Sequence, residues 1–496
     1  MSRRTALAMA TTITLPLAVS VAVLAGSASG ARAQTLQEAL GQAYTNNPTL
    51  QTARAQLRVI DENVPQALAG WRPTVTLSGS AGYQDANARA KSGPISVYQD
   101  VSRDTLTLQA TASQPIYRGG RTVAQTQRAE NQVMAQRARL LATEQQVLSD
   151  AVQAYINVIR YQEEVRLNLN NVQVLQRQLD ATNERFRVGE ITRTDVAQAE
   201  SRLAAARATR ADAEGQLQSA RAVFRRVIGT VPVSLTAPQP LRPPVRSAVE
   251  ASQAAATNNP NVVAALFDEA AARSLIDVQT GALLPQVSAQ AQQFRVDNST
   301  QPNTRGTGTA ITATVSVPIY QGGAEYSTVR QARQDASRYR QIIDDQRRTS
   351  AQQAASAWET LVSNRATVES NRAAIRAAEV ALDGVQREAV VGSRTTLDVL
   401  NQEQELLNNR VALVRALASN VTSSYSLAAA VGRLTARDLA LPVPLYDMTA
   451  YYKAVRNRWI GLGSDSETIQ SADAAPVAGT VPATATPPST MAPVGR

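Results

Sequence analysis

The chain has 496 residues, of which 44% are hydrophobic but only 4% aromatic, and its 50 basic residues exceed its 40 acidic residues by 10. It contains no cysteine and no histidine, which excludes disulfides, Cys/His metal sites, Ser–His or Cys–His catalytic pairs and histidine pH switches. Only two of the basic residues are lysine and 86 residues are alanine, so the apolar side chains are mostly small and suit close helix packing.

Residues 1–33 are predicted to be a secretory signal peptide. Arg3 and Arg4 give a positive start, an apolar stretch runs from Ala6 to Ala25, and Ala31-Arg32-Ala33 is a small-x-small cleavage site. A retained membrane anchor is the alternative, but a proline and several threonines interrupt the stretch. After residue 34 no apolar run approaches the roughly 20 residues of a membrane helix. The mature chain is therefore expected to be secreted, periplasmic or inserted as a β-barrel.

The first half of the mature chain, 34–246, is predicted to begin with a short helix followed by a β-hairpin over 73–115. Apolar or small residues alternate there with hydroxylic ones, over 74–83 and again over 105–112. Each strand is expected to have about the 9–11 residues that cross a bilayer. Residues 121–188 lack proline and glycine, and a single helix over 120–188 would be about 100 Å long. The remaining predicted parts are a tip turn (188–195), a helix (195–229) and a proline-rich connector (230–246).

The second half, 247–432, repeats the same plan. Pro115-Ile116-Tyr117-Arg118-Gly119-Gly120 recurs as Pro318-Ile319-Tyr320-Gln321-Gly322-Gly323, and Val188-Gly189 recurs as Val391-Gly392. The predicted parts are a helix, a β-hairpin (285–318), a long helix (323–391), a tip turn (391–398) and a helix (398–431). Apolar residues fall seven apart in both long helices, which favours a coiled seam with neighbouring helices. These positions are Val158, Val165, Val172, Leu179 and Phe186, and Leu361, Val368, Ile375, Leu382 and Ala389.

Two segments lie outside the repeat. Residues 433–463 are rich in aromatic side chains, whereas 464–496 consist mainly of Ala, Pro, Thr and Ser and are predicted to be a disordered tail.

The two hairpins supply four strands. A sheet on a soluble core would show the same alternation, but these hairpins join helices of about 100 Å and no soluble core lies nearby to cover them. Four strands cannot close a barrel, and lipid does not tolerate open sheet edges. A membrane-spanning chain must therefore oligomerise, to eight strands as a dimer or twelve as a trimer. Trp71, Tyr117 and Tyr320 at the strand–helix boundary fit an interfacial aromatic girdle, and equally fit ordinary packing.

These motifs make the chain similar to the TolC family of outer-membrane channel-tunnels, over about residues 35–460. The resemblance rests on the duplicated plan, an Asn-Pro near the start of each half, the Pro-Ile-Tyr-x-Gly-Gly junctions and the Val-Gly turns followed by Asp-Val. It implies a mainly α fold with a small transmembrane β-barrel of twelve strands that closes only in a homotrimer. It also implies a periplasmic α-helical tunnel, an equatorial belt from 230–246 and 433–463, and no cofactor.

The resemblance further implies that the protein exports proteins or small molecules across the outer membrane, with most of the chain in the periplasm. Its partners would be outer-membrane lipid, a periplasmic adaptor protein, and an inner-membrane pump or ABC exporter of a type I secretion or tripartite efflux system. The family places the tip turns at the periplasmic entrance, where aspartates ring the constriction. The matching tip and gate positions are Gly189, Thr194 and Asp195, and Gly392, Arg394 and Asp398; the strand–helix junctions are Pro115, Gly119, Gly120, Pro318, Gly322 and Gly323.

The alternative role for the two aspartates is helix N-capping, worth about 1 kcal/mol. We favour capping for Asp195 and gating for Asp398. A further family aspartate, one turn beyond Asp398, is replaced here by Asn401, which leaves one aspartate ring in place of two.

Three other functions fit the sequence less well. An enzyme is not expected, because no paired acids form a recognisable pocket motif. Nucleic-acid binding is not expected either, because the arginines are interleaved with Glu and Gln along long helices of an exported chain. A periplasmic adaptor with a coiled-coil hairpin is the main alternative, but it would not need duplicated alternating β-hairpins.

Overall fold

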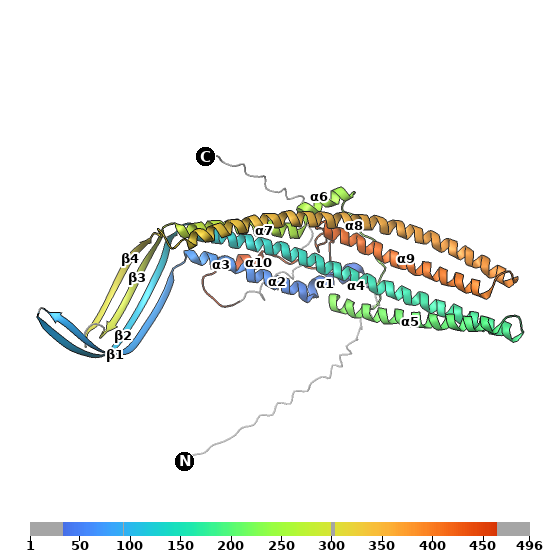
Figure 1. Ribbon diagram of the computed structural model, residues 1–496, viewed down its shortest axis with the longest axis horizontal. Helices are drawn as coiled ribbons and strands as arrows, with labels where there is room; N and C mark the ends of the chain where they lie inside the picture. The colour runs from blue at the N-terminus through green and yellow to red at the C-terminus, as the bar shows by residue number, and fades with distance from the viewer. Residues whose placement is uncertain (1–32, 93, 299–302, 464–496) are drawn as a thin grey trace, which may run out of the picture.

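The computed structural model describes residues 33–92, 94–298 and 303–463, and it shows a strongly elongated chain (Figure 1). A four-stranded sheet lies at one end, and two long helical hairpins extend to the other end. The predicted signal peptide, apart from residue 33, and the predicted disordered tail lie outside the described residues.

The first half begins with three short helices and a 3-10 turn, followed by two strands and two long helices. In order these are α1 (Leu36–Asn46), α2 (Pro48–Asp61), α3 (Asn63–Leu68), η1 (Ala69–Trp71), β1 (Thr74–Ser92), β2 (Ile95–Arg118), α4 (Arg121–Arg187) and α5 (Arg193–Ile228). The second half follows the same order, except that one helix, α7, stands in place of α2 and α3. Its elements are α6 (Ala248–Asn258), α7 (Pro260–Thr280), η2 (Gly281–Leu283), β3 (Gln286–Asp297), β4 (Arg305–Ser316), α8 (Ala324–Val390) and α9 (Thr396–Ala430), before a final α10 (Ala450–Val455).

The predicted fold class of the single chain, mainly α with four strands in a duplicated plan, is confirmed. Some details differ from expectation. The first hairpin has strands of 19 and 24 residues, longer than expected, and β2 runs past 115 to Arg118 because β3 pairs with it there. The helices after the tips begin at Arg193 and Thr396, each two residues before the expected start, because a threonine upstream caps them.

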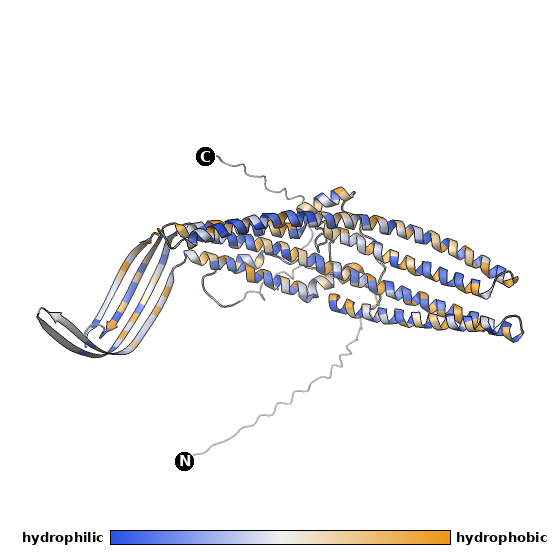
Figure 2. Ribbon diagram, in the orientation of Figure 1, coloured by the Kyte–Doolittle hydropathy of each residue, from blue (hydrophilic) through white to orange (hydrophobic). Residues whose placement is uncertain are grey.

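The sheet has two chemically different faces. Its strands run antiparallel in the order β1-β2-β3-β4, and residues paired across strands share a face. One line of paired residues is apolar, whereas the adjacent line is polar: these are Val75–Ala112–Ala291–Ile311 and Thr74–Ser113–Gln290–Thr312. The apolar side chains are uncovered, with Leu77 83% and Ile311 80% exposed. Figure 2 shows the corresponding alternation of hydropathy along the strands.

The largest apolar cluster among the described residues lies around the middle of α4. Tyr155 of α4 and Phe224 of α5 are fully buried there, with ring centroids 6.3 Å apart. The single hydroxyl hydrogen of Tyr155 is shared between the carbonyls of Gln34 and Thr236, whose oxygens lie 2.7 and 2.8 Å from the hydroxyl oxygen. This contact ties the N-terminal segment and the connector to the bundle. No helix in the described ranges combines the length and the apolar character needed to span a bilayer.

The Asn-Pro pairs tie the start of each half to its end. Asn47 caps α2 and Asn259 caps α7, with the following proline at the first helical position in both cases. The Asn47 side-chain amide donates to the Val227 carbonyl at 2.9 Å, and that of Asn259 donates to the Ala430 carbonyl at 3.1 Å. The short helix expected at the start of each half is therefore interrupted at this asparagine, which connects it to the end of α5 or α9.

Candidate functional site

The two tip turns have the same backbone. In the first, Glu190 N–H donates to the Arg185 carbonyl at 3.0 Å and Gly189 N–H to the Phe186 carbonyl at 3.0 Å, which is a Schellman motif. The second turn repeats both bonds from Ser393 and Gly392. Gly189 and Gly392 have φ values of +78° and +80°, so glycine at these positions ends the long helix without strain.

Both tip aspartates act as caps. Asp195 accepts from the backbone N–H of Thr192 at 3.0 Å, and Asp398 accepts from that of Thr395 at 3.0 Å, each forming a capping box. The threonine hydroxyls donate as well, and together these hydrogen bonds lower the pKa of both carboxyls below the ordinary value. Thr194 is exposed in the first turn of α5, so Thr192 is the capping threonine and Thr194 is not.

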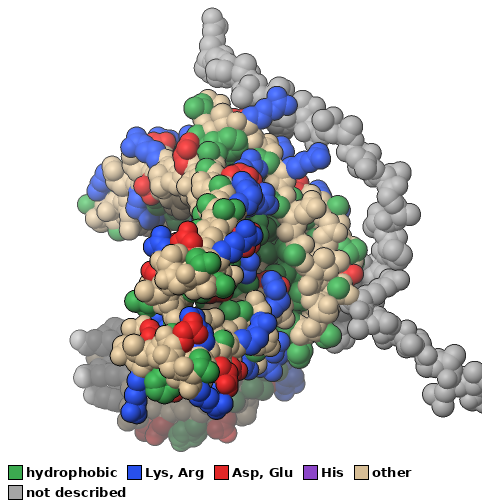
Figure 3. Space-filling model, turned by 90° about the vertical axis from the view of Figure 1, so that its right-hand side faces the viewer, with side chains coloured by type: hydrophobic (Ala, Val, Ile, Leu, Met, Phe, Trp, Pro, Cys, Tyr) green, Lys and Arg blue, Asp and Glu red, His purple; other side chains and the backbone are tan. Residues whose placement is uncertain are grey.

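Arg394 lies in the same turn as Asp398 but pairs with Glu388. Its Nε is 2.9 Å from the Glu388 carboxylate, so the ion pair closes the turn onto the end of α8. Arg185 and Glu190 form the corresponding ion pair in the first turn. Figure 3 shows basic and acidic side chains interspersed over this end of the molecule. The most exposed apolar side chains of the two turns are valines, with Val188 79% and Val391 78% exposed.

Near the tips, α9 contacts the first hairpin. Leu400 of α9 is 2% exposed, in an apolar cluster with Leu179 and Leu203 of the first hairpin. Asn401 accepts a hydrogen bond from Arg202 of α5 at 2.9 Å. Asn401 thus links the two hairpins within one chain, through a partner, Arg202, that no sequence motif indicated.

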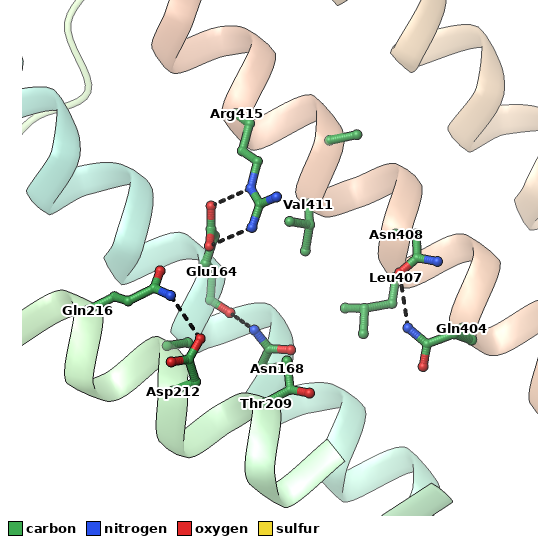
Figure 4. A pocket seen from close by; sticks show the side chains of 12 residues that line it. Glu164, Asn168, Thr209, Asp212, Gln216, Gln404, Leu407, Asn408, Val411 and Arg415 are labelled. Carbon is green, nitrogen blue, oxygen red and sulfur yellow. Dashed lines mark hydrogen bonds and ion pairs between the residues drawn. The ribbon is translucent and has the colours of Figure 1, made fainter. Parts of the chain in front are cut away.

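Further from the tip, a polar cleft of about 410 Å³ separates α9 from α4 and α5 (Figure 4). The Glu164 carboxylate of α4, 5% exposed, receives Arg415 of α9 at 2.9 and 3.3 Å, and Arg160 lies 3.7 Å away. Asp212 and Gln216 of α5 line the opposite wall. This ion pair could not be predicted, because nothing in the alternation of charges along α4 distinguishes Glu164 from its solvated neighbours.

The strand–helix junctions differ between the two halves. Gly119 has φ +61°, and a Cβ there would lie 2.3 Å from the Gly281 carbonyl oxygen, so α4 begins in close backbone contact with the second half. Gly120, Gly322 and Gly323 also have positive φ but nothing within 4 Å of a Cβ. Pro115 lies at a register shift in β2, whereas β4 ends at Ser316, before Pro318. In the described part of the chain, no group of three or more acidic residues is placed to hold a metal ion.

Comparison with known proteins agrees with this architecture. A family model described as outer membrane efflux protein matches residues 39–230 and 251–433, which are the two halves. "Outer membrane efflux protein BepC" of Brucella suis biovar 1 (strain 1330) is 36% identical over 445 residues, covering 90% of this chain and 95% of that protein. "Outer membrane protein TolC" of Escherichia coli (strain K12) is 25% identical over 458 residues, covering 86% and 87%. Among solved structures, the outer membrane protein VceC of Vibrio cholerae matches with a TM-score of 0.69 at 20% identity, covering 80% and 96%.

The fold and these matches define the class of outer membrane efflux proteins. The chain belongs to the outer membrane efflux protein family, since the family model covers both of its halves. The resemblance to the TolC family and the location in the outer membrane are therefore confirmed, and the alternative of a periplasmic adaptor is not supported.

Proposed function

We propose that three copies of this chain assemble head to tail into one conduit, a closed β-barrel in the outer membrane continued by an α-helical tunnel in the periplasm. The observation that carries the proposal is that the two halves share one plan, but only one of the two possible contacts between them is made within a single chain. β2 pairs with β3 of the second half, whereas the outer edges of β1 and β4 have no strand partner among the described residues. An edge of β4 that pairs with β1 of the next copy would repeat the β2–β3 arrangement and close a ring.

The helices support the same arrangement. α4 packs against its own α2 and also against α7 of the second half, where Arg139 and Asp268 form an ion pair. α8 packs against its own α6 and α7, but within the described chain it has no comparable contact with α2. The junction glycines follow this pattern, because Gly119 is in contact with η2 and its counterpart Gly322 is open. The α2–η1 region of a neighbouring copy would fill the vacant position.

The number of copies follows from the strand count and the resemblance. A single chain supplies four strands, and membrane barrels need at least about eight, so two copies reach the minimum and three reach twelve. The family resemblance selects three. The apolar face of the sheet would then meet lipid, and the Ser, Thr and Gln face would line the lumen. Trp71, Tyr117 and Tyr320 are 41%, 44% and 76% exposed at the strand–helix boundary, which fits an aromatic girdle.

The strand length fits a bilayer. Gln286 and Asp297 are eleven residue steps apart on β3, which is about 37 Å along the strand and about 27 Å along the membrane normal at a tilt of about 40–45°. This matches the apolar band of about 25 Å in outer-membrane barrels.

The conduit would export proteins or small molecules for an inner-membrane pump or ABC exporter, with a periplasmic adaptor seated on the tips. Relatives named "Proteases secretion protein PrtF" and "Cobalt-zinc-cadmium resistance protein CzcC" support both kinds of cargo. The tip turns would form the entrance, with Asp398 contributing to its constriction and Arg394 to its closure. The exposed Val188 and Val391 are suited to contact an adaptor.

The test is membrane fractionation combined with unheated gel electrophoresis and planar-bilayer recording. We expect an outer-membrane oligomer three times the protomer mass that dissociates on heating and conducts ions after reconstitution. A soluble monomer, or a stable dimer, would refute the proposed assembly. Crosslinking followed by co-purification of an adaptor tests the partner.

A further inference from the structure

The far end of the apolar sheet face carries an unusual group of charges. Asp297, the last residue of β3, is 2.8 Å from Nη2 of Arg295 and 2.9 Å from Nε of Arg305, the first residue of β4. Asp297 is opposite Leu106 and Arg305 in the register, and Arg295 is opposite Leu108, so all three charged residues lie on the apolar face. Two arginines thus converge on one carboxylate where the apolar face ends.

The geometry leaves donors free to bind a ligand. In the single chain the Arg305 side chain is 65% exposed and that of Arg295 is 42% exposed, whereas Asp297 is 17% exposed behind them. Arg305 engages Asp297 through Nε, and Arg295 through Nε and Nη2. These bonds fix the orientation of both guanidinium groups, and no other described residue is paired with the Nη atoms of Arg305. Asp104 lies two residues before Leu106 on β2, exposed on the same face, and its carboxylate could compete with a ligand for the two arginines.

The position of the group indicates the kind of ligand. It lies about 27 Å along the membrane normal from the strand–helix boundary, at the limit of an apolar band of about 25 Å. In the proposed assembly this is the depth of the polar headgroups of the outer leaflet, on the side of the sheet that would face lipid. Guanidinium groups bind phosphate through paired N–H donors, and their weak hydration favours them over lysine at such a boundary.

We propose that Arg295 and Arg305, oriented by Asp297, form a binding site for a phosphate group of an outer-leaflet lipid. The inference rests on the proposed function, because it requires the sheet to span the membrane. Arg305 supplies two terminal N–H donors to the phosphate, Arg295 supplies the second positive charge, and Asp297 prevents the two guanidinium groups from separating. Three such sites would surround the channel at the outer surface.

The test uses the purified oligomer in detergent and three probes: diphosphorylated lipid A, the same glycolipid without phosphates, and inorganic phosphate. Binding is measured by native mass spectrometry and by titration. We expect Arg305→Ala and Arg295→Ala each to weaken lipid A binding by about tenfold, with a smaller loss for Arg305→Lys. The dephosphorylated glycolipid should bind the unsubstituted protein as weakly as lipid A binds the variants.

Arg103 provides a matched control. It lies at the same end of the sheet but on the polar face, hydrogen-bonded to Gln84 at 3.0 and 3.3 Å, and Arg103→Ala should leave lipid A binding unchanged. Equal losses for Arg103→Ala and Arg305→Ala, or no loss in either, would overturn the site. Inorganic phosphate that competes fully with lipid A at equal concentration would show a free-phosphate site and overturn the lipid assignment.

The same preparations separate this inference from the proposed function. Heat-labile migration as an oligomer shows that each variant has assembled, and bilayer conductance shows that it forms a channel. If the channels conduct normally and phosphate makes no difference to glycolipid binding, the lipid site alone fails. If no oligomer and no conductance are found for the unsubstituted chain, the proposed function fails.

Discussion

Replacing Arg415 with alanine should destabilise the contact between the two helical hairpins. Arg415 projects from α9 and is 61% exposed, whereas its partner Glu164 on α4 is 5% exposed. The substitution leaves that carboxylate with Arg160, 3.7 Å away, as its remaining cation among the described residues, and the bonds at 2.9 and 3.3 Å are lost. The neighbouring cleft admits water, which moderates the effect.

The magnitude follows from the burial of the two partners. Breaking a fully buried ion pair costs about 3–5 kcal/mol, and an exposed pair contributes about 0–1 kcal/mol. Because only Glu164 is buried, we expect a loss of about 1.5–3 kcal/mol in the free energy of unfolding, the range of a hydrogen bond to a charged group. Glu164→Gln in the Arg415→Ala background should recover part of this loss, since it removes the unpaired charge.

The assay is denaturant unfolding of the purified protein, followed by a double-mutant cycle. Arg410→Ala is the matched control, because Arg410 lies on the same helix and pairs with Glu379 at 2.9 Å within one hairpin, with side chains 37% and 48% exposed. It should cost less than about 1 kcal/mol. Equal effects of Arg415→Ala and Arg410→Ala, or a coupling energy near zero between Glu164 and Arg415, would refute this reasoning.

Three further predictions concern the junction, a buried acid and the tip. Gly119→Ala should impair assembly much more than Gly120→Ala, because only a Cβ at position 119 meets a carbonyl oxygen, at 2.3 Å. The amount of heat-labile oligomer on gels measures assembly, and equal effects of the two substitutions would contradict this prediction. Burial raises the pKa of the Asp61 carboxyl from 3.8 to about 6. The protonated carboxyl therefore stabilises the folded state by at most about 3 kcal/mol below pH 3.8, and this contribution is lost as the pH rises through 6. Unfolding free energies at pH 5 and 8 should differ less in Asp61→Asn, and an unchanged difference would exclude this carboxyl as the cause. Arg394→Ala should make reconstituted channels leakier to small ions. Asp398→Asn keeps an oxygen acceptor for the capping box but removes the charge, so it should alter the conductance if Asp398 lines the entrance. Unchanged conductance in both variants would count against a gate at these residues.

The duplicated plan could be predicted from the sequence, because the features that specify it are local. Proline and glycine bound the long helices, alternation of apolar and hydroxylic residues marks the strands, and a Val-Gly turn followed by Asp-Val marks each tip. The seven-residue seam also holds for most of its length: Val158 and Leu361 are buried, and only near the tip does a member, Phe186, become 42% exposed. The length of the first hairpin was underestimated because polar residues of β1 and β2 continue the strands beyond the alternating stretch.

Which charged side chains meet depends on how the helices pack together. Glu164 and Arg415 are separated by 251 residues and Arg202 and Asn401 by 199, so no local pattern could pair them. The packed structure also pairs Arg394 with Glu388 and places both tip aspartates in capping boxes, whereas the sequence favoured capping for Asp195 and gating for Asp398. The two junction motifs could not show that Gly119 lies in close contact with the second half while Gly322 has no atom within 4 Å of a Cβ. This difference depends on what packs against each half.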